Sequence, residues 1–140
     1  MDRLTAEQRS WNMSRVRSRD TKPEKLVRSM LHRMGYRFSL RRKDLPGRPD
    51  IVLPYHKTVV FVHGCFWHQH SGCPKAKKPD SHSEFWDEKL RSNERRDKFT
   101  GKALRHAGWR VIVIWECQLI RSPERVGANL DRRLRQKRKG

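Results

Sequence analysis

The sequence predicts an α/β fold, in which a central mixed β-sheet is flanked by helices, within a single domain of residues 1–140. Three observations predict it. The chain has 140 residues, the size of one ordinary domain. Its apolar residues gather in short β-branched runs, typical of buried strands, at 51–53, 58–62 and 111–115. Segments with helical spacing of apolar residues precede, separate and follow these runs, so helices and strands are expected to pack in layers.

The first half of the sequence predicts two helices, each beginning at a capping box. Residues 5–8 (TAEQ) have this form, and a basic, weakly amphipathic helix is expected from there to about residue 17. A second box, TKPE at 21–24, has proline in its first turn. Apolar side chains then recur at helical spacing up to Gly35, a common type of helix stop because glycine tolerates the left-handed conformation.

The sequence after this helix predicts three short strands and a tight loop. Residues 36–40 alternate in polarity and predict a short strand. Residues 45–49 (LPGRP) predict a tight loop, because two prolines fix φ and the glycine permits a turn. Strands are then expected at 50–53 and 58–63, with a turn between them, and the second is apolar enough to be buried on both faces.

The second half of the sequence predicts a loop, a helix, a strand and a last helix. Residues 64–79 are irregular and rich in Cys, His and Lys. A helix is expected from about residue 83 to Ala107, with Asn93 as a candidate break. Residues 109–115 predict a third central strand, and Ser122 begins the last helix.

The chain is strongly basic, since 34 Lys and Arg against 15 Asp and Glu give a formal net charge of +19. A domain of this size repels itself unless a polyanion neutralises it, and the phosphate backbone of nucleic acid is the commonest such partner. Residues 132–140 are expected to form a solvated basic tail that attracts phosphates. No basic amphipathic helix with an aromatic face stands out, which makes anionic lipid the weaker alternative.

Composition also argues against a membrane or secreted protein. No apolar stretch approaches the ~20 residues that cross a bilayer, and residues 1–20 lack the apolar region of a signal peptide. Three cysteines, an odd number, argue against a disulfide framework. We expect a cytoplasmic, nucleoid-associated monomer with reduced or metal-bound cysteines.

The spacing of cysteine and histidine predicts a structural zinc site. Cys65, His70 and Cys73 have C-x4-H-x2-C spacing, and Cys117 follows a predicted core strand. Together they make a Cys3His set, which structural Zn²⁺ accepts. The alternative is three reduced thiols acting as small hydrophobic side chains. Spacing leaves open which histidine ligates, because other candidates lie nearby: His63 and His68.

A carboxylate and two histidines predict a hydrolytic site. Asp50 begins a strand, and His63 and His68 lie on the neighbouring strand and loop. Carboxylate oxygens suit a hard divalent cation, and imidazole is the usual base near neutral pH. On spacing alone, Glu24 is better explained as the acid of its capping box. Asp97 is explained equally well as one half of an i,i+4 ion pair on a solvated helix.

Aromatic side chains stand among the basic residues and suggest contact with bases. Flat rings beside cationic groups suit stacking on bases or wedging between base pairs. Trp67 and Trp86 lie in polar surroundings and are the better candidates, whereas Phe85 is expected in the core.

These residues resemble one known family, the very short patch repair (Vsr) DNA mismatch endonucleases. The resemblance runs from about Asn12 to Cys117 and rests on motifs in the same order with near-identical gaps: LPGRPD at 45–50, FVHGCFWH at 61–68, EFW at 84–86, NERRD at 93–97, GWR at 108–110 and WEC at 115–117.

The resemblance implies a restriction-endonuclease-like fold with a structural zinc. It also implies an Mg²⁺-dependent nick in one strand of double-stranded DNA, 5′ to the thymine of a T·G mismatch left by deamination of 5-methylcytosine. A functional link to a cytosine-5 methyltransferase and to mismatch-repair proteins is a further expectation.

The resemblance also assigns roles to individual positions. Asp50 and the backbone carbonyl of Val62 would bind Mg²⁺, His68 would be the general base, and His63 would support the phosphate or the water. Glu24 and Asp97 match acidic positions that hold metal-bound waters or orient the histidines. The zinc ligands become Cys65, His70, Cys73 and Cys117, and the residues that contact DNA become Met13, Phe66, Trp67 and Trp86.

The chain departs from the family pattern at one position, since Val62 stands where some relatives carry threonine. It also lacks the acid-x-Lys half of the general PD-(D/E)xK nuclease signature, as the family does. Two alternatives remain beside a mismatch endonuclease: a restriction-type nuclease of other specificity, and a zinc-stapled nucleic-acid-binding module without catalysis.

Overall fold

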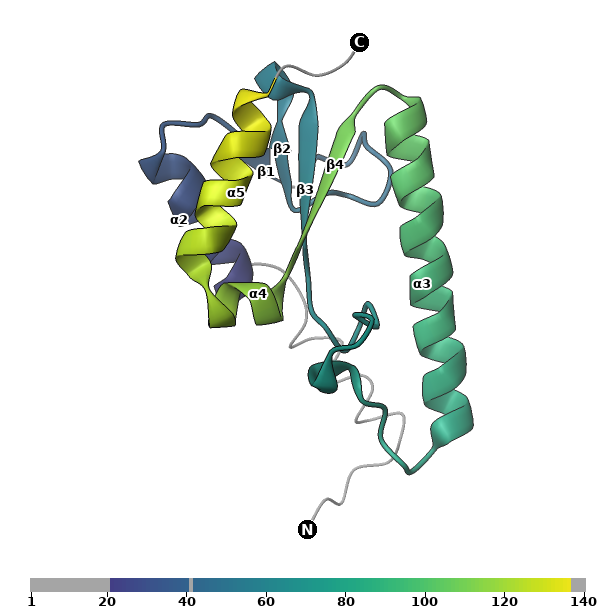
Figure 1. Ribbon diagram of the computed structural model, residues 1–140. Helices are drawn as coiled ribbons and strands as arrows, with labels where there is room; N and C mark the ends of the chain where they lie inside the picture. Colours follow the sequence, from purple (N-terminus) through teal and green to yellow (C-terminus); the bar gives the residue numbers. More distant parts are fainter. Residues whose placement is uncertain (1–20, 41, 137–140) are drawn as a thin grey trace.

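A four-stranded sheet lies between two layers of helices in the computed structural model of the chain, which describes residues 21–40 and 42–136 (Figure 1). The predicted first helix with Met13, and residues 137–140 of the predicted tail, lie outside the described residues. Among the described helices, none is both long and apolar enough to cross a membrane.

Helix α2 (Lys22–Arg33) forms where its capping box predicts it. The Thr21 hydroxyl accepts a hydrogen bond from the Glu24 N–H at 3.3 Å, a cap that stabilises a helix by ~1 kcal/mol. At the other end Gly35 has a φ of +86°, and its N–H and the next one bond back to His32 and Leu31. This pair of bonds is a Schellman motif, so glycine ends the helix for the predicted reason.

The sheet has the order β1-β2-β3-β4 and is mixed, as predicted. Strands β1 (Ser39–Leu40), β2 (Ile51–Leu53) and β3 (Thr58–His63) pair antiparallel, and β4 (Arg110–Trp115) runs parallel to β3. A parallel pair needs a long crossover, and here the long helix α3 (Ser83–His106) supplies it.

Side chains alternate across the sheet and build a separate core on each face. One core joins the sheet to α2, α4 (Glu116–Arg121) and α5 (Pro123–Arg135), and it contains Leu31, Val60, Ile112 and Leu130. The other core joins the opposite face to α3 and contains Val59 and Leu104. Figure 1 shows the same arrangement, with α5 and α2 on one side of the strands and α3 on the other.

Three details of the predicted elements are wrong. The strand expected at 36–40 is reduced to β1, because Tyr36 is taken up by the end of α2 and bonds Asp131 of α5 at 2.5 Å. Helix α3 is not broken at Asn93, whose buried side chain donates to the Trp67 carbonyl at 3.2 Å. Helix α4 was not predicted at all.

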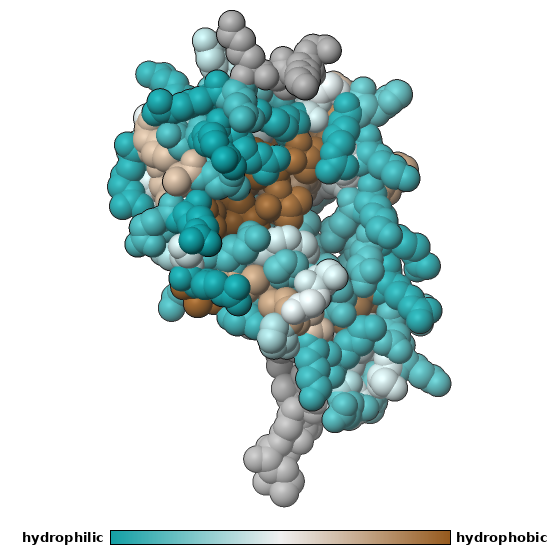
Figure 2. Space-filling view, viewed as in Figure 1, coloured by the Kyte–Doolittle hydropathy of each residue, from teal (hydrophilic) through white to brown (hydrophobic). Residues whose placement is uncertain are grey.

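The strand expected at the centre of the sheet, β4, stands at its edge among the described residues. A groove of about 630 Å³ lies beside it, between Ile112, Val113 and Ile114 and helix α5. Figure 2 shows an apolar area in the middle of the view, between α5 and α3, within an otherwise hydrophilic face. The run at 111–115 is therefore apolar because of the layers above and below it, not because of strands on both sides.

The first residues of the segment expected to be a basic tail, from residue 132, are helical. Helix α5 continues to Arg135, and Leu134 is buried in the core beside α2. The first part of that segment is therefore packed structure rather than a solvated extension.

Candidate active site

A cleft of about 700 Å³ opens where the amino end of β2 meets the carboxyl end of β3, between α2 and α3. Every residue that the sequence predicts to be catalytic lines the cleft: Glu24, Asp50, His63, His68 and Asp97. Val62, Phe66 and Trp67 line it as well. Five separate segments supply these side chains: α2, the start of β2, β3, the loop after β3, and α3. The antiparallel pairing of β2 with β3 brings Asp50 close to His63, because it places the start of β2 beside the end of β3.

The loop at residues 45–49 brings Asp50 into the cleft. Gly47 has a φ of +72° and lies so close to Thr100 of α3 that a Cβ atom would overlap that side chain. Glycine is therefore required both by the conformation and by the contact. The loop is held against α3 at this point, which fixes one wall of the cleft next to Asp50.

Asp50 is held by the backbone of β3. Its Oδ2 accepts a hydrogen bond from the Val62 N–H at 2.7 Å. In an extended strand the N–H and C=O of one residue point to the same side. The Val62 carbonyl therefore lies on the same side of β3 as the Asp50 carboxylate, and two hard oxygen donors share this corner of the cleft.

The two predicted histidines form a stacked pair anchored to α3. The rings of His63 and His68 are nearly parallel, at 5°, with centroids 3.7 Å apart. His68 Nδ1 lies 2.6 Å from Asp97 Oδ2. Because this nitrogen donates to the carboxylate, the proton sits on Nδ1, and Nε2 is left as the basic atom.

His63, His68 and Asp97 have donor atoms within 4.8 Å of one another, close enough to hold a metal ion, but one distance favours a hydrogen bond. Two ligands on one Mg²⁺ or Zn²⁺ would be roughly 2.9–3.3 Å apart or more, given bonds of ~2.1 Å. The 2.6 Å between His68 and Asp97 is shorter and is a hydrogen-bond distance. The arrangement instead matches a base with its orienting carboxylate.

Glu24 lies in the cleft with its charge paired. It is 7% exposed, and its Oε2 accepts from Arg28 Nη2 at 3.1 Å, one turn along α2. Its backbone N–H takes part in the Thr21 cap. The residue thus contributes its backbone to the helix start while its carboxylate lines the cleft.

The four residues predicted as zinc ligands come together beside the cleft. Cys65, His70 and Cys73 belong to the Cys/His loop (residues 64–73), and Cys117 lies in the first turn of α4. All four donor atoms lie within 4.8 Å of one another. His70 Nδ1 is 3.7 Å from Cys65 Sγ and 3.3 Å from Cys117 Sγ. Tetrahedral Zn²⁺ would separate such atoms by roughly 3.6 Å, so the set fits this ion.

Two thiols in this cluster have pKa values that are shifted in opposite directions. Burial raises the pKa of Cys65 to about 12, and hydrogen bonds with the neighbouring thiols add to the rise. The pKa of Cys73 is lowered: burial opposes the shift, but hydrogen bonds from the Lys75 and Ala76 backbone and from the other two thiols outweigh it. A bound divalent cation would take the place of these protons, which is the usual state of a Cys3His site.

The aromatic residues form a cluster at the amino-terminal end of α3. Trp67, Trp86 and Leu90 pack together with Phe66 against them. The expectation for the neighbouring pair is reversed, because Trp86 is 2% exposed while Phe85 is 36% exposed. Phe66 and Trp67 line the cleft, and Trp86 supports them from behind through ring contacts at 5.4 and 6.1 Å.

Three residues at the site were not assigned a role from the sequence. Trp115 touches both His63 and His70, and the Glu116 carboxylate accepts a hydrogen bond from the Cys65 N–H at 3.2 Å. Asn93 holds the loop at Trp67. The parallel pairing of β3 with β4 creates the Trp115 contacts, and a sequence pattern does not specify that register.

Comparison with known proteins finds a matching family and several similar sequences. A sequence profile of the family described as "DNA mismatch endonuclease Vsr" matches residues 1–75. The chain is 53% identical over 118 residues to the type II nicking enzyme V.XorIIP of Xanthomonas oryzae pv. oryzae, which covers 84% of this chain and 86% of the relative.

Two further relatives are similar over most of their length. The type II nicking enzyme V.NmeAIP of Neisseria meningitidis serogroup A is 47% identical over 118 residues, 84% of each chain. The DNA mismatch endonuclease Vsr of Escherichia coli (strain K12) is 44% identical over 111 residues, 79% of this chain and 70% of the relative.

Proposed function

This chain belongs to the Vsr family of DNA mismatch endonucleases and is a DNA endonuclease, and we propose that it nicks one strand of double-stranded DNA 5′ to the thymine of a T·G mismatch. The observation that carries the proposal is the cleft itself. It gathers a carboxylate beside a backbone carbonyl, a histidine oriented by an acid, and two aromatic rings.

The two donor sets suit two different metals. Asp50 and the Val62 carbonyl would hold Mg²⁺, which binds oxygen, commonly keeps several waters and needs only one or two carboxylates from a protein. Cys65, His70, Cys73 and Cys117 would hold Zn²⁺. When bound, Mg²⁺ would polarise the scissile phosphate and neutralise the charge that develops on it.

The side chains of the cleft activate the attacking water and hold the base in position. His68 Nε2 takes the proton of the attacking water, because Asp97 keeps Nδ1 protonated and stabilises the positive ring that results. His63, stacked on His68, limits how that ring can move and lies beside the phosphate position. Glu24, paired with Arg28, completes the acidic side of the cleft.

The aromatic cluster suits a mismatch, because a mispaired step is easier to unstack than a matched one. Phe66 and Trp67 line the cleft and would enter the base stack, with Trp86 behind them as support. Met13, which would contact the minor groove, lies outside the described residues. We also propose that the fold is restriction-endonuclease-like, that residues 1–140 act as one monomeric domain, and that the protein is cytoplasmic and nucleoid-associated.

Replacing Asp97 with asparagine is expected to lower the single-turnover nicking rate by about 10²-fold or more, because an amide can donate to Nδ1 and favour the wrong tautomer of His68. DNA affinity and melting temperature should change little. The matched control is Asp87→Asn on the same helix, where the carboxylate pairs with Lys78 at the surface. Equal rates for the two variants would contradict the role of Asp97.

The proposed function is tested with three labelled duplexes that differ at one base pair: T·G, T·A and C·G. Each is incubated with the protein in Mg²⁺ or in EDTA, and the product is mapped on both strands. We expect one nick, 5′ to the mismatched thymine, only with Mg²⁺. Cleavage of the matched duplexes would indicate a restriction-type nuclease, and binding without any product would indicate a module that does not cleave.

A further inference from the structure

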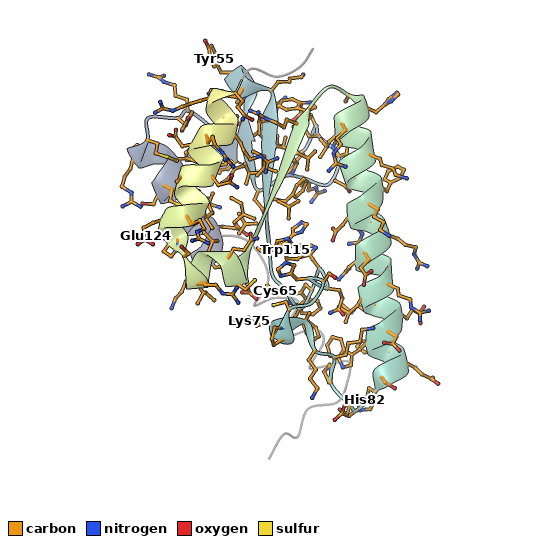
Figure 3. The ribbon with its side chains drawn as sticks, viewed as in Figure 1. Tyr55, Cys65, Lys75, His82, Trp115 and Glu124 are labelled. Atoms are coloured by element: carbon orange, nitrogen blue, oxygen red, sulfur yellow. The ribbon has the colours of Figure 1, made fainter. Side chains whose placement is uncertain are left out.

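Trp115 lies between the stacked pair of His63 and His68 and the predicted zinc ligand His70. Its indole stacks on the imidazole of His70, with centroids 4.1 Å apart and planes at 9°. The same indole meets His63 edge to face, at 5.2 Å and 73°. Figure 3 shows Trp115 next to Cys65, at the carboxyl end of β4.

The strand pairing fixes the contact with His63, and the two residues after Trp115 hold the loop that carries His70. In the parallel pairing of β3 with β4, His63 and Trp115 are direct partners, so their side chains stand next to each other on one face of the sheet. The two following residues bind the Cys/His loop: Glu116 accepts from the Cys65 N–H, and Cys117 Sγ is 3.3 Å from His70 Nδ1. Three consecutive residues thus fasten the loop to the end of β4.

A continuous series of contacts therefore joins the cysteine cluster to the proposed base. It runs from His70 to Trp115, from Trp115 to His63, from His63 to His68 by stacking at 3.7 Å, and from His68 to Asp97. His63 and Glu116 line the cleft, whereas Trp115 is not among the described residues that line it. The contact of the Trp115 ring with the residues of the cleft is therefore made through His63.

We propose that Trp115 is a positioning residue: it transmits the geometry of the Cys3His cluster to the stacked histidines, so that the cluster sets the reach of the base as well as holding the fold together. This inference rests on the proposed function. A displacement of ~1 Å at a reacting group can cost ~10²-fold in rate. Loss of the indole should therefore slow the chemical step much more than it weakens DNA binding.

The test compares tryptophans just before and at the end of the same strand. Trp115→Leu and Trp115→Met remove the ring, and Trp115→Phe retains one that can stack. Trp109→Leu is the matched control, since Trp109 precedes β4 and is buried against Val59 and Leu104, outside the cleft. Four quantities are measured for each: zinc per chain, melting temperature, affinity for the T·G duplex without Mg²⁺, and single-turnover nicking rate.

We expect the two ringless variants to keep one zinc per chain and an affinity within about threefold of the original, while their nicking rate falls by ~10²-fold. Trp115→Phe should recover most of the rate. Trp109→Leu should melt earlier yet nick at the original rate below its melting temperature. Two ringless variants are made so that the comparison rests on whichever folds.

Two outcomes would overturn the inference. Original rates in a zinc-loaded ringless variant would show that the indole only fills space, and loss of zinc in parallel with loss of rate in all three variants would show that it serves the cluster alone. Failure of the unaltered protein to nick the T·G duplex would instead count against the proposed function, so the two failures are distinguishable.

Discussion

Replacing Asp50 with asparagine is expected to lower the nicking rate on the T·G duplex by at least ~10³-fold, the largest effect of any single substitution in the cleft. Asparagine retains an oxygen that can accept the Val62 N–H, so the corner where β2 meets β3 should keep its shape. It lacks the negative charge that a hard cation requires. Single-turnover rates across a range of Mg²⁺ concentrations measure the effect.

The matched control for this substitution is Asp44→Asn, six residues earlier, where an exposed carboxylate pairs with Arg42 outside the cleft. It should nick at the original rate. Affinity for the T·G duplex should be retained in both variants, and Asp50→Ala should behave as Asp50→Asn does. Near-original activity in Asp50→Asn at saturating Mg²⁺ would show that this carboxylate does not hold the catalytic ion.

Much of the cleft follows from local features of the sequence. Proline and glycine at 45–49 predict the loop, and the antiparallel pairing of β2 with β3 places Asp50 next to the end of β3. The C-x4-H-x2-C spacing predicts most of the cysteine cluster, because a short loop can bring three ligands together. These contacts span few residues, so local conformation decides them.

The errors arise where helical phase or long-range pairing decides. Phe85 and Trp86 are neighbours, and a phase difference of one residue turns a side chain by ~100° around the helix. The buried positions Leu90 and Leu104 would have given the phase, and they place Trp86 inward. The contacts of Trp115 depend on the register between β3 and β4, which are joined only through α3. No local pattern encodes that register.

Glu24 shows why residue type alone could not settle a role. Its position in TKPE explains it completely as a capping residue, and the Thr21 cap is present. The same residue also turns its carboxylate to Arg28 and to the cleft. The Thr21 cap uses the Glu24 backbone N–H, while the carboxylate of the same residue pairs with Arg28 and lines the cleft.

The second large effect is expected from Cys117→Ser, which should reduce bound zinc from one per chain to well below half and lower the melting temperature by ~10 °C or more. Metal binding energy in such sites is also folding energy, amounting to ~10 kcal/mol or more for small zinc domains, and each 1 kcal/mol shifts the melting temperature of a domain this size by ~3–5 °C. Cys117 is the one ligand that ties the Cys/His loop to β4 and α4. Its loss should therefore free the loop and lower the nicking rate together with stability.

Chelator titration of the unaltered protein is the control for Cys117→Ser, because removing zinc should bring its melting temperature to that of the variant. Adding a chelator to Cys117→Ser should then change little, since the ion is already weakly held. This pattern separates loss of the ion from loss of a small buried side chain, which would add to the chelator effect. A variant with one zinc per chain and an unchanged melting temperature would show that Cys117 is only a packed thiol and that the cluster does not fasten the cleft.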